Sequence, residues 1–298
     1  MPATTILAET LEVLIARNRG DGSRITAIRL TPYFTVIQVD ESCVGAVMSY
    51  YRLPHAVQGD VESGLESVAA RDPLLSDWLL RNKAPDLPLG RHADQLALLE
   101  SAVMAALTSA LSVPWLIVGG DSTFSVRSAG AVDPFAQVGR ALVVGFGGYA
   151  SVLAQAAHVR RLDICDLSYP RRREQMDRFA REHERRQPGK IITVSGGEDL
   201  TELMARADAI AITGSALANG TMDGLLARVP AGTPVIVQGQ SAAIHPVALF
   251  QRGVHLVQTT LKPPELLALA GADTIGARMR GLLDGGSLPW IDLVRGPS

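Results

Sequence analysis

Residues 141–166 read as a strand, a glycine turn, a helix and a second strand that ends in an acid. The turn at 145–150 matches the pattern G-x-G-x-x-A, and the helical stretch after it covers 151–159. A second, mostly apolar run begins at Leu162 and ends at Asp166. This order of elements is typical of dinucleotide-binding folds, in which parallel strands are joined by helices.

Each residue of the turn has a physical reason to be there. Gly145 can adopt a tight turn that a Cβ atom would resist. Gly147 lets the backbone approach a ligand closely, and Ala150 is small enough for the helix to pack on the sheet. Asp166 follows Gly145 by 21 residues, where an acid can accept hydrogen bonds from ribose hydroxyls. The pattern therefore predicts a nucleoside or nucleotide site, and it is compatible with NAD, FAD and S-adenosylmethionine alike.

Composition narrows the class of protein. The chain has 298 residues, 47% of them hydrophobic and 19% charged, so it can build a substantial core in one large domain or two ordinary ones. A net charge of −2 argues against a nucleic-acid surface. The arginines between 171 and 186 alternate with acids, which indicates the solvated face of a helix.

The cysteines indicate a reducing compartment, and the histidines do not indicate a metal site. Cys43 and Cys165 stand far apart in apolar runs and are expected to be buried free thiols. The six histidines lack the spacing of metal ligands. We find neither a signal peptide nor an apolar run of the roughly 20 residues that cross a bilayer. We expect a soluble, cytoplasmic homodimer that acts on a small molecule, with no metal, membrane or nucleic-acid partner.

The first part of the chain, residues 1–112, predicts a small α+β domain, and residues 113–139 are interpreted as the crossing to a second domain. The expected helices are 4–18, 60–71, 74–81 and 92–111, and the expected strands are 25–30, 35–39 and 43–50.

From residue 140 to residue 298 strands alternate with helices, which predicts a Rossmann-like parallel sheet covered on both faces. The expected strands are 141–145, 162–166, 191–195, 208–213, 234–238 and 254–258. The expected helices are 149–158, 170–187, 198–206, 220–228, 244–251 and 263–283. Ligands of such sheets bind beyond the carboxyl ends of the strands, so the loops that follow the strands are the candidate site.

Two of these loops leave alternatives open. Ser195 and Gly197 either border an adenine ring or cap the helix that follows. His245 is either a catalytic base or, since a proline follows it at a helix start, a structural residue.

The loop at 213–221 is dense in small hydroxyl residues and contains one amide, Asn219. Such groups can bind a polar zwitterion without adding charge. Thr213, Ser215 and Asn219 are therefore candidates to orient the ligand, although Asn219 or Thr221 could also cap the next helix.

Several blocks resemble the DUF364 ("heavy-metal chelation") family. They are Ile212–Thr221, Val237–Pro246 and Leu249–Val254, with Val144–Phe146 and Asp166–Pro170 matching earlier blocks. Cys43–Val47 resembles a strand of the accompanying DUF4213 domain. The resemblance implies an enolase-N-terminal-like domain, then a Rossmann-like domain, with a cleft between them. Gln240, Ala242 and Asp166 depart from the residues usual in the family, so a metal-related role is not carried over.

Within the family that this chain resembles, one branch looks like enzymes that use the aminocarboxypropyl arm of S-adenosylmethionine. Among such enzymes are the azetidine-2-carboxylate synthases of secondary metabolism. This resemblance implies a cyclase that releases methylthioadenosine. One alternative is a transferase of metal-chelator biosynthesis that moves the methyl or aminocarboxypropyl group to an external acceptor. The others are a non-catalytic protein that binds a metal complex or nucleotide, and a nicotinamide oxidoreductase.

The predicted site follows from these loops. The catalytic candidates are Tyr169, Thr213, Ser215 and Asn219. The S-adenosylmethionine-binding candidates are Gly145, Phe146, Gly147, Gly148, Tyr149, Asp166, Leu167, Ser195, Gly197, Thr213 and Gly214. The aromatic rings that could shelter the sulfonium are Phe146, Tyr149 and Tyr169, with Tyr33, Phe34, Tyr50 or Tyr51 closing from the first domain.

Overall fold

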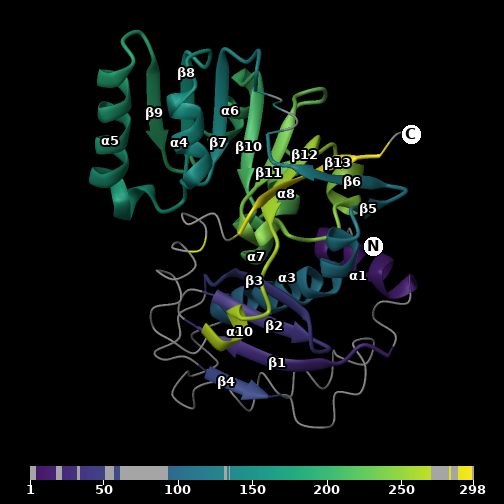
Figure 1. The fold of residues 1–298 in the computed structure, drawn as a ribbon. Helices are drawn as coiled ribbons and strands as arrows, with labels where there is room; N and C mark the ends of the chain where they lie inside the picture. Colours follow the sequence, from purple (N-terminus) through teal and green to yellow (C-terminus); the bar gives the residue numbers. More distant parts are fainter. Residues whose placement is uncertain are drawn as a thin grey trace.

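The computed structural model describes residues 5–17, 22–31, 34–50, 57–60, 93–130, 133, 135–269, 282 and 288–296. Over these residues the chain forms a four-stranded sheet and a nine-stranded sheet, one below the other in Figure 1. This confirms the expected α/β class, with a Rossmann-like sheet beside a smaller α+β unit. The expected helices at 60–71 and 74–81 lie outside the described residues.

The small sheet is antiparallel and has the strand order β3-β2-β1-β4. Its strands are β1 (Ile25–Leu30), β2 (Phe34–Val39), β3 (Cys43–Met48) and β4 (Val57–Asp60). The first three were expected from their β-branched and apolar content, and β4 was not.

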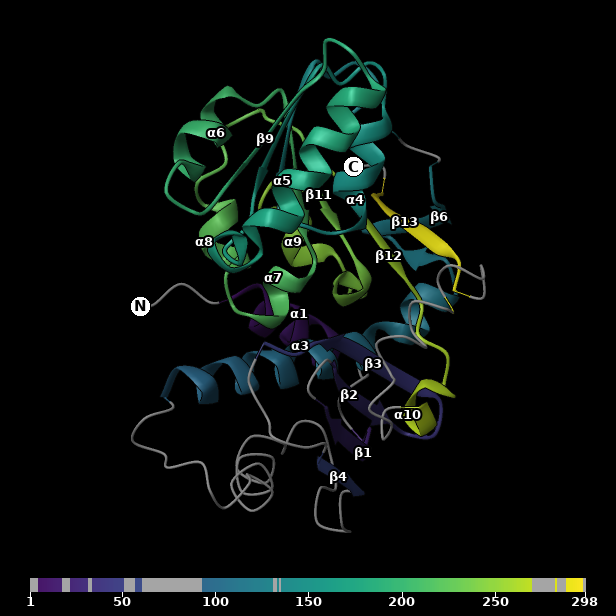
Figure 2. The same cartoon turned by 90° about the vertical axis from the view of Figure 1, so that its left-hand side faces the viewer.

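Two helices pack on this sheet, α1 (Ile6–Ala16) and α3 (Ala93–Ile117). Figure 2 shows α3 lying between the small sheet and the large one. It extends past the predicted end at residue 111 and contains Pro114. By length and composition Ala97–Ile117 could cross a membrane, but 67% of its most apolar window is buried inside the protein. It is therefore packed as a core helix.

Six parallel strands form the centre of the large sheet, in the order β12-β11-β10-β7-β8-β9. They are β7 (Arg140–Val144), β8 (Arg161–Cys165), β9 (Ile191–Ser195), β10 (Ala209–Thr213), β11 (Val235–Gln238) and β12 (Leu256–Thr260). Each agrees with its predicted range to within one or two residues. The chain winds outward from β7 in one direction and from β10 in the other, so the topological switch point lies between these two strands.

Helices cover both faces of the parallel strands (Figure 2). One face packs on α4 (Gly148–Gln155) and α5 (Tyr169–Arg186). The other packs on α6 (Leu200–Arg206), α7 (Ser215–Ala218), α8 (Met222–Leu226) and α9 (Val247–Gln251). The helices expected at 149–158, 170–187 and 198–206 are confirmed, whereas α8 and α9 are shorter than predicted.

The interpretation of residues 113–139 as a simple crossing is wrong. This stretch contains the end of α3 and two strands of the large sheet, β5 (Gly120–Asp121) and β6 (Phe124–Ser128). They extend the sheet through β13 (Trp290–Arg295), which pairs antiparallel with both β12 and β6. These strands are short or partly polar, and pairing with neighbours stabilises them more than their own sequence does.

The end of the chain also returns to the small sheet. After β12, the helix α10 (Leu266–Leu269) is the described part of the helix expected at 263–283. Leu266 and Leu288 pack on Phe34 and Val36, on the face of the small sheet that is turned away from α3. Residues 140–298 therefore do not form a unit separate from the small sheet, although the sequence suggested that they would.

A single apolar core runs through both sheets. The same buried cluster includes Ile28 and Ile37 of the small sheet and Ile210 and Val257 of the large one, joined through α1 and α3. Polar contacts add to it. Arg252 of α9 donates two hydrogen bonds to the carboxylate of Glu9 in α1, at 2.6 and 2.8 Å. The two sheets are thus packed as one body.

Candidate nucleoside site

The glycine turn lies at the switch point. Gly145 follows β7 with φ +100°, and a Cβ atom placed there would lie 2.4 Å from Cγ2 of Thr213, the last residue of β10. Gly145 is therefore required both by its backbone conformation and by the close approach of the two strand ends. Gly147 and Gly148 are exposed at the start of α4, where backbone N–H groups face outward.

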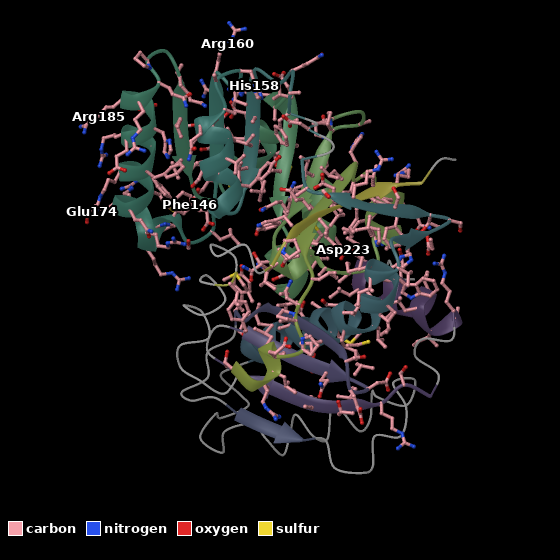
Figure 3. The ribbon with its side chains drawn as sticks, in the orientation of Figure 1. Phe146, His158, Arg160, Glu174, Arg185 and Asp223 are labelled. Carbon is pink, nitrogen blue, oxygen red and sulfur yellow. The ribbon has the colours of Figure 1, made fainter. Side chains whose placement is uncertain are left out.

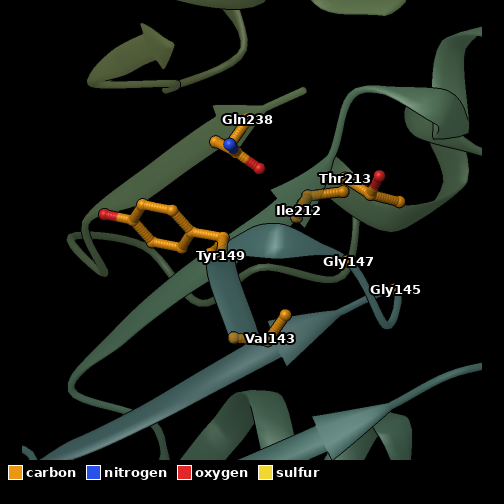
Figure 4. A pocket seen from close by; sticks show the side chains of 8 residues that line it. Val143, Gly145, Gly147, Tyr149, Ile212, Thr213 and Gln238 are labelled. Atoms are coloured by element: carbon orange, nitrogen blue, oxygen red, sulfur yellow. The ribbon is translucent and has the colours of Figure 1, made fainter. Parts of the chain in front are cut away.

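A pocket opens between β7, β10 and β11 (Figure 4). Its lining consists of Val143, Gly145, Gly147, Tyr149, Ala211, Ile212, Thr213 and Gln238. Its empty volume is about 210 Å³, including the part open to solvent. The space that the centre of a water-sized sphere can occupy is only about 10 Å³, which is roughly one water molecule. A nucleoside would therefore lie over this shallow hollow and the neighbouring loops.

Tyr149 forms one wall of this pocket. Its ring packs edge-on against Phe135, with 5.7 Å between the ring centroids. Burial, and then the charges of Asp133 and Asp292, raise the pKa of its hydroxyl, so the side chain is a neutral phenol at physiological pH. The structure thus places this predicted aromatic residue at the pocket.

Asp166 has a role that the sequence did not predict. Its Oδ2 accepts the Phe146 N–H at 2.6 Å, and its Oδ1 accepts the N–H of Ser168 at 2.7 Å as well as the Ser168 hydroxyl. The carboxylate therefore ties the glycine turn to the loop after β8. A carboxylate has about four acceptor positions, so these three bonds leave room for a ribose hydroxyl.

Phe146 lies beside α5 (Figure 3), and Tyr169 is the first residue of that helix. The Phe146 ring packs edge-on against Phe179, at 5.1 Å between centroids. The Tyr169 hydroxyl donates to Asp177 at 3.1 Å and accepts from Arg173 Nε at 3.3 Å. Both side chains contact α5, and their predicted roles in sheltering the sulfonium and, for Tyr169, in catalysis stay predictions.

The loop after β10 brings two predicted hydroxyls together. Thr213 Oγ1 and Ser215 Oγ lie 2.9 Å apart. Gly214 between them donates its N–H to the Gln238 carbonyl at 2.7 Å. A Cβ atom on Gly214 would lie 2.8 Å from the Ala242 backbone nitrogen, so this loop packs directly on the turn of 3-10 helix η3 (Gln240–Ala242). Thr213, Gly214 and Ser215 thus face the Gly145 turn as a neutral polar wall.

The side chain of Asn219 has the second of its two predicted roles, that of a helix cap. Its Oδ1 accepts the Thr221 N–H at 3.1 Å and the Thr221 hydroxyl at 2.7 Å, just before α8 begins. This Asx turn caps the start of the helix. The backbone N–H of Asn219 also donates to the Ser215 carbonyl at 3.2 Å, so Asn219 lies one turn beyond Ser215. Its place in the catalytic set stays a prediction.

The loops after β8 and β9 form a second, more apolar part of the edge. Leu167 is 72% exposed, and a Cβ atom on Gly197 would lie 3.2 Å from its Cδ2. The Ser195 carbonyl accepts the Asp166 N–H at 3.0 Å, which holds the two loops side by side. An exposed leucine beside glycine backbone is a surface on which a planar base can lie. Cys165 below it is a buried free thiol, as expected, and burial raises its pKa to about 11.

Tyr50 follows β3 by two residues and is 38% exposed. Burial of its hydroxyl raises the pKa of Tyr50. Phe34 is instead buried on the outer face of the small sheet. Tyr33 and Tyr51 lie outside the described residues.

His245 lies away from this edge in a buried cluster. Its Nε2 is 2.9 Å from Asp121 Oδ2 and 3.1 Å from Arg17 Nη1. Burial, and then the Arg17 charge, lower its pKa to about 4. A fully buried, neutral imidazole that joins α1 to β5 favours the structural alternative over the catalytic base.

Lys262 is a site residue that sequence reasoning missed. It is buried just after β12, and its Nζ donates to the carbonyls of Gln240 and Thr260 at 2.8 Å each and to Thr260 Oγ1 at 3.0 Å. Since all three partners are neutral, complete burial lowers its pKa to about 7. The lysine holds η3 against the sheet, and only the packing reveals it.

Replacing Lys262 by methionine should remove the part of the pH dependence of the free energy of unfolding that this lysine causes. The folded-state pKa lies below the unfolded value, so the unfolded chain binds more protons and the free energy of unfolding rises with pH between about 7 and about 10. The maximal slope is about 1.4 kcal/mol per pH unit. Urea unfolding of both proteins across this range measures it. Other groups titrate in both proteins, so the contribution of Lys262 is the difference between the two pH slopes. Equal slopes would contradict the lowered pKa of Lys262.

No group of three or more His, Cys, Asp or Glu side chains that could hold a metal ion occurs within the part of the chain that the structure describes.

Comparison with known proteins gives a family match for slightly less than half of the chain. Residues 131–270 match the model of the DUF364 family, described as "Putative heavy-metal chelation". A DUF364 protein of unknown function from Pyrococcus horikoshii is 13% identical, with a TM-score of 0.61 over 98% of this chain and 100% of that one. Another, from Desulfitobacterium hafniense DCB-2, is 16% identical, with a TM-score of 0.53 over 96% and 99%.

No curated protein matches the chain. At these identities the two solved structures show a shared fold. The match to the DUF364 family model covers residues 131–270, which contain the switch point and the loops around it.

Proposed function

We propose that the crevice at the switch point binds S-adenosylmethionine as a substrate. The protein would close its aminocarboxypropyl arm to azetidine-2-carboxylate and release methylthioadenosine. The observation that carries the proposal is the meeting of the Gly145 turn with the neutral hydroxyls of Thr213 and Ser215. A nucleoside turn beside uncharged polar groups suits a ligand that has a zwitterionic tail.

The remaining parts of the edge suit the rest of this ligand. The free acceptor position of Asp166 can take a ribose hydroxyl, and exposed Leu167 offers a surface for the adenine ring. The Gly147 and Gly148 backbone lies open beside them. Thr213 and Ser215 can donate to the carboxylate or accept from the amine of the tail.

The cyclisation requires little acid–base catalysis from the protein. The α-amine, with an unperturbed pKa of about 8, loses a proton to water. Its lone pair then attacks Cγ, the Cγ–S bond breaks, and the bonding pair remains on the sulfur of methylthioadenosine. The sulfonium is already a good leaving group. The main task is therefore to hold nitrogen behind Cγ and in line with sulfur, which is a problem of orientation.

Incubation of the purified protein with S-adenosylmethionine alone tests the proposal. We expect methylthioadenosine, followed by chromatography, and an equal amount of azetidine-2-carboxylate, followed by mass spectrometry, well above the spontaneous breakdown in buffer. Products that appear only with an added acceptor would indicate a transferase instead. Binding without turnover would indicate a carrier.

The description of the matched family favours one alternative, a transfer reaction toward a metal chelator or the binding of a metal complex. Parallel titrations with divalent metal ions and with S-adenosylmethionine separate this alternative from the cyclase. We further propose that the protein works in the cytoplasm as a homodimer without a resident metal.

A further inference from the structure

A row of polar side chains leads across the large sheet from the pocket. Gln238, the last residue of β11, lines the pocket (Figure 4). It is paired with Gln258 of β12, which is paired in turn with Asp292 of β13. Two residues earlier in their strands, Ile236 and Leu256 belong to the buried cluster that α4 covers. The three polar side chains therefore start from the α4 face of the sheet, and their backbones span roughly 10 Å, since neighbouring strands are roughly 5 Å apart.

Asp292 is a buried carboxylate without a cation beside it. It is 0% exposed, and it accepts the Gly130 N–H with Oδ2 and the Gln258 amide NH2 with Oδ1, at 2.9 Å each. Both donors are neutral. Arg127, its neighbour in register on β6, is exposed, and no basic side chain in the described ranges forms an ion pair with Asp292. A buried charge is costly unless it is paired, so this part of the sheet favours a positively charged ligand group.

The carboxylate also sets the direction of the amide beside it. A carboxylate only accepts hydrogen bonds, so Gln258 turns its NH2 group toward Asp292 and its oxygen away. Within the described part of the chain, neither this oxygen nor the side-chain amide of Gln238 has a hydrogen-bond partner. Both remain for a ligand. Amide oxygens with a buried carboxylate behind them suit an ammonium group, which donates hydrogen bonds and carries the compensating charge.

We propose that Gln238, Gln258 and Asp292 form the subsite for the ammonium group of the ligand. The proposal rests on the proposed function, because it takes the amino-acid end of an adenosyl ligand as the group that is bound. Gln238 contacts the amine, and Asp292 is a positioning residue that acts through Gln258. Thr213 and Ser215 are then left to donate to the carboxylate of the same end. The amine thus binds on the β11 side of β10, whereas the nucleoside loops of β7 and β8 lie on the other side.

Two adenosyl thioethers test this subsite. S-adenosylhomocysteine carries the amino-acid end and methylthioadenosine lacks it, and the sulfur of both is neutral. Asp292→Asn removes the charge with little change of shape. We expect it to weaken binding of S-adenosylhomocysteine roughly 5- to 30-fold, as for a unit charge about 8–15 Å away at an effective dielectric constant of about 20. Binding of methylthioadenosine should not change. Asp208→Asn is the matched control, because Asp208 accepts the Arg140 N–H at the opposite, amino end of the strands.

The pH dependence of binding distinguishes the ammonium group from the carboxylate. The α-amine, with an unperturbed pKa of about 8, loses its charge as the pH rises, so the parent should bind S-adenosylhomocysteine more weakly above about pH 8. Asp292→Asn should flatten this fall. Tyr149 stays neutral because burial raises its pKa, and Lys262, with a pKa of about 7, affects both ligands alike. Titration calorimetry of the full chain between about pH 7 and about pH 10 measures the effect.

Weaker binding of S-adenosylhomocysteine with a flatter pH dependence in Asp292→Asn supports the proposal. Equal weakening of both ligands, or unchanged binding, overturns it while the proposed function stands. If thermal melting shows that Asp292→Asn does not fold, two variants of the half-buried Gln238 decide. Gln238→Glu should bind S-adenosylhomocysteine at least roughly 10-fold more tightly than Gln238→Leu, and equal affinity overturns the proposal. Failure of the unsubstituted protein to bind S-adenosylmethionine or either thioether overturns the proposed function itself.

Discussion

Gly45→Ala should leave the protein without a stable fold. Gly45 lies in the middle of β3, and a Cβ atom there would lie 2.0 Å from the Ala106 carbonyl oxygen and 2.5 Å from the Ala110 nitrogen of α3. Both are backbone atoms inside a helix, so neither can move without shifting α3 away from the sheet. Overpacking of this kind commonly costs about 1–3 kcal/mol, and we expect at least the upper end.

Urea unfolding followed by circular dichroism measures the loss for Gly45→Ala. Gly224→Ala is the matched control, because Gly224 is exposed in α8 and a Cβ atom there meets nothing within 4 Å. Alanine is the better helix former by roughly 1 kcal/mol, so this variant should be slightly more stable than the parent. Equal stability of the two variants would show that β3 and α3 do not approach as closely as described.

Gly145→Ala should abolish nucleoside binding. The φ of +100° is strained for alanine, and its Cβ atom would lie 2.4 and 2.8 Å from Cγ2 and Cβ of Thr213. Thr213 cannot turn away without breaking its contact with Ser215, so the turn and the wall of the pocket would both shift. We expect a loss of about 2–5 kcal/mol in stability, from backbone strain and overpacking together, and no measurable binding of S-adenosylmethionine.

Gly147→Ala separates folding from binding in the same turn. A Cβ atom at Gly147 meets nothing within 4 Å, and its φ of −135° is available to alanine. Stability should therefore stay within about 0.5 kcal/mol of the parent. Weaker binding of S-adenosylmethionine by this stable variant, measured by calorimetry, would mean that the ligand lies against the backbone here. Tight binding by Gly145→Ala would refute the placement of the site.

The parallel half of the fold could be predicted because its signal is local. From β7 to β12 each strand is an apolar run that a helix separates from the next, and both faces of the sheet are buried. β5, β6 and β13 could not be predicted in this way. Gly120–Asp121 and Phe124–Ser128 have weak strand patterns of their own and become strands by pairing, β6 with β13 and β5 with β6.

The site was predictable in outline but not in its contacts. The glycine pattern located Gly145 and Thr213 correctly, because strand ends at a switch point must meet. The sequence could not show that Asp166 binds the turn itself or that Asn219 caps α8, since both roles depend on which N–H groups lie within reach.

The continuous apolar core has a consequence for how substrate reaches the crevice. Enzymes that open by hinge motion keep separate cores on either side of a flexible connection. Here a swing of one half against the other would expose side chains from α1, α3 and α9 to water. Substrate therefore has to reach the crevice with the two sheets in their present arrangement. Only the loops at the strand ends are left to move, so the rate of association should depend little on motion of one sheet against the other.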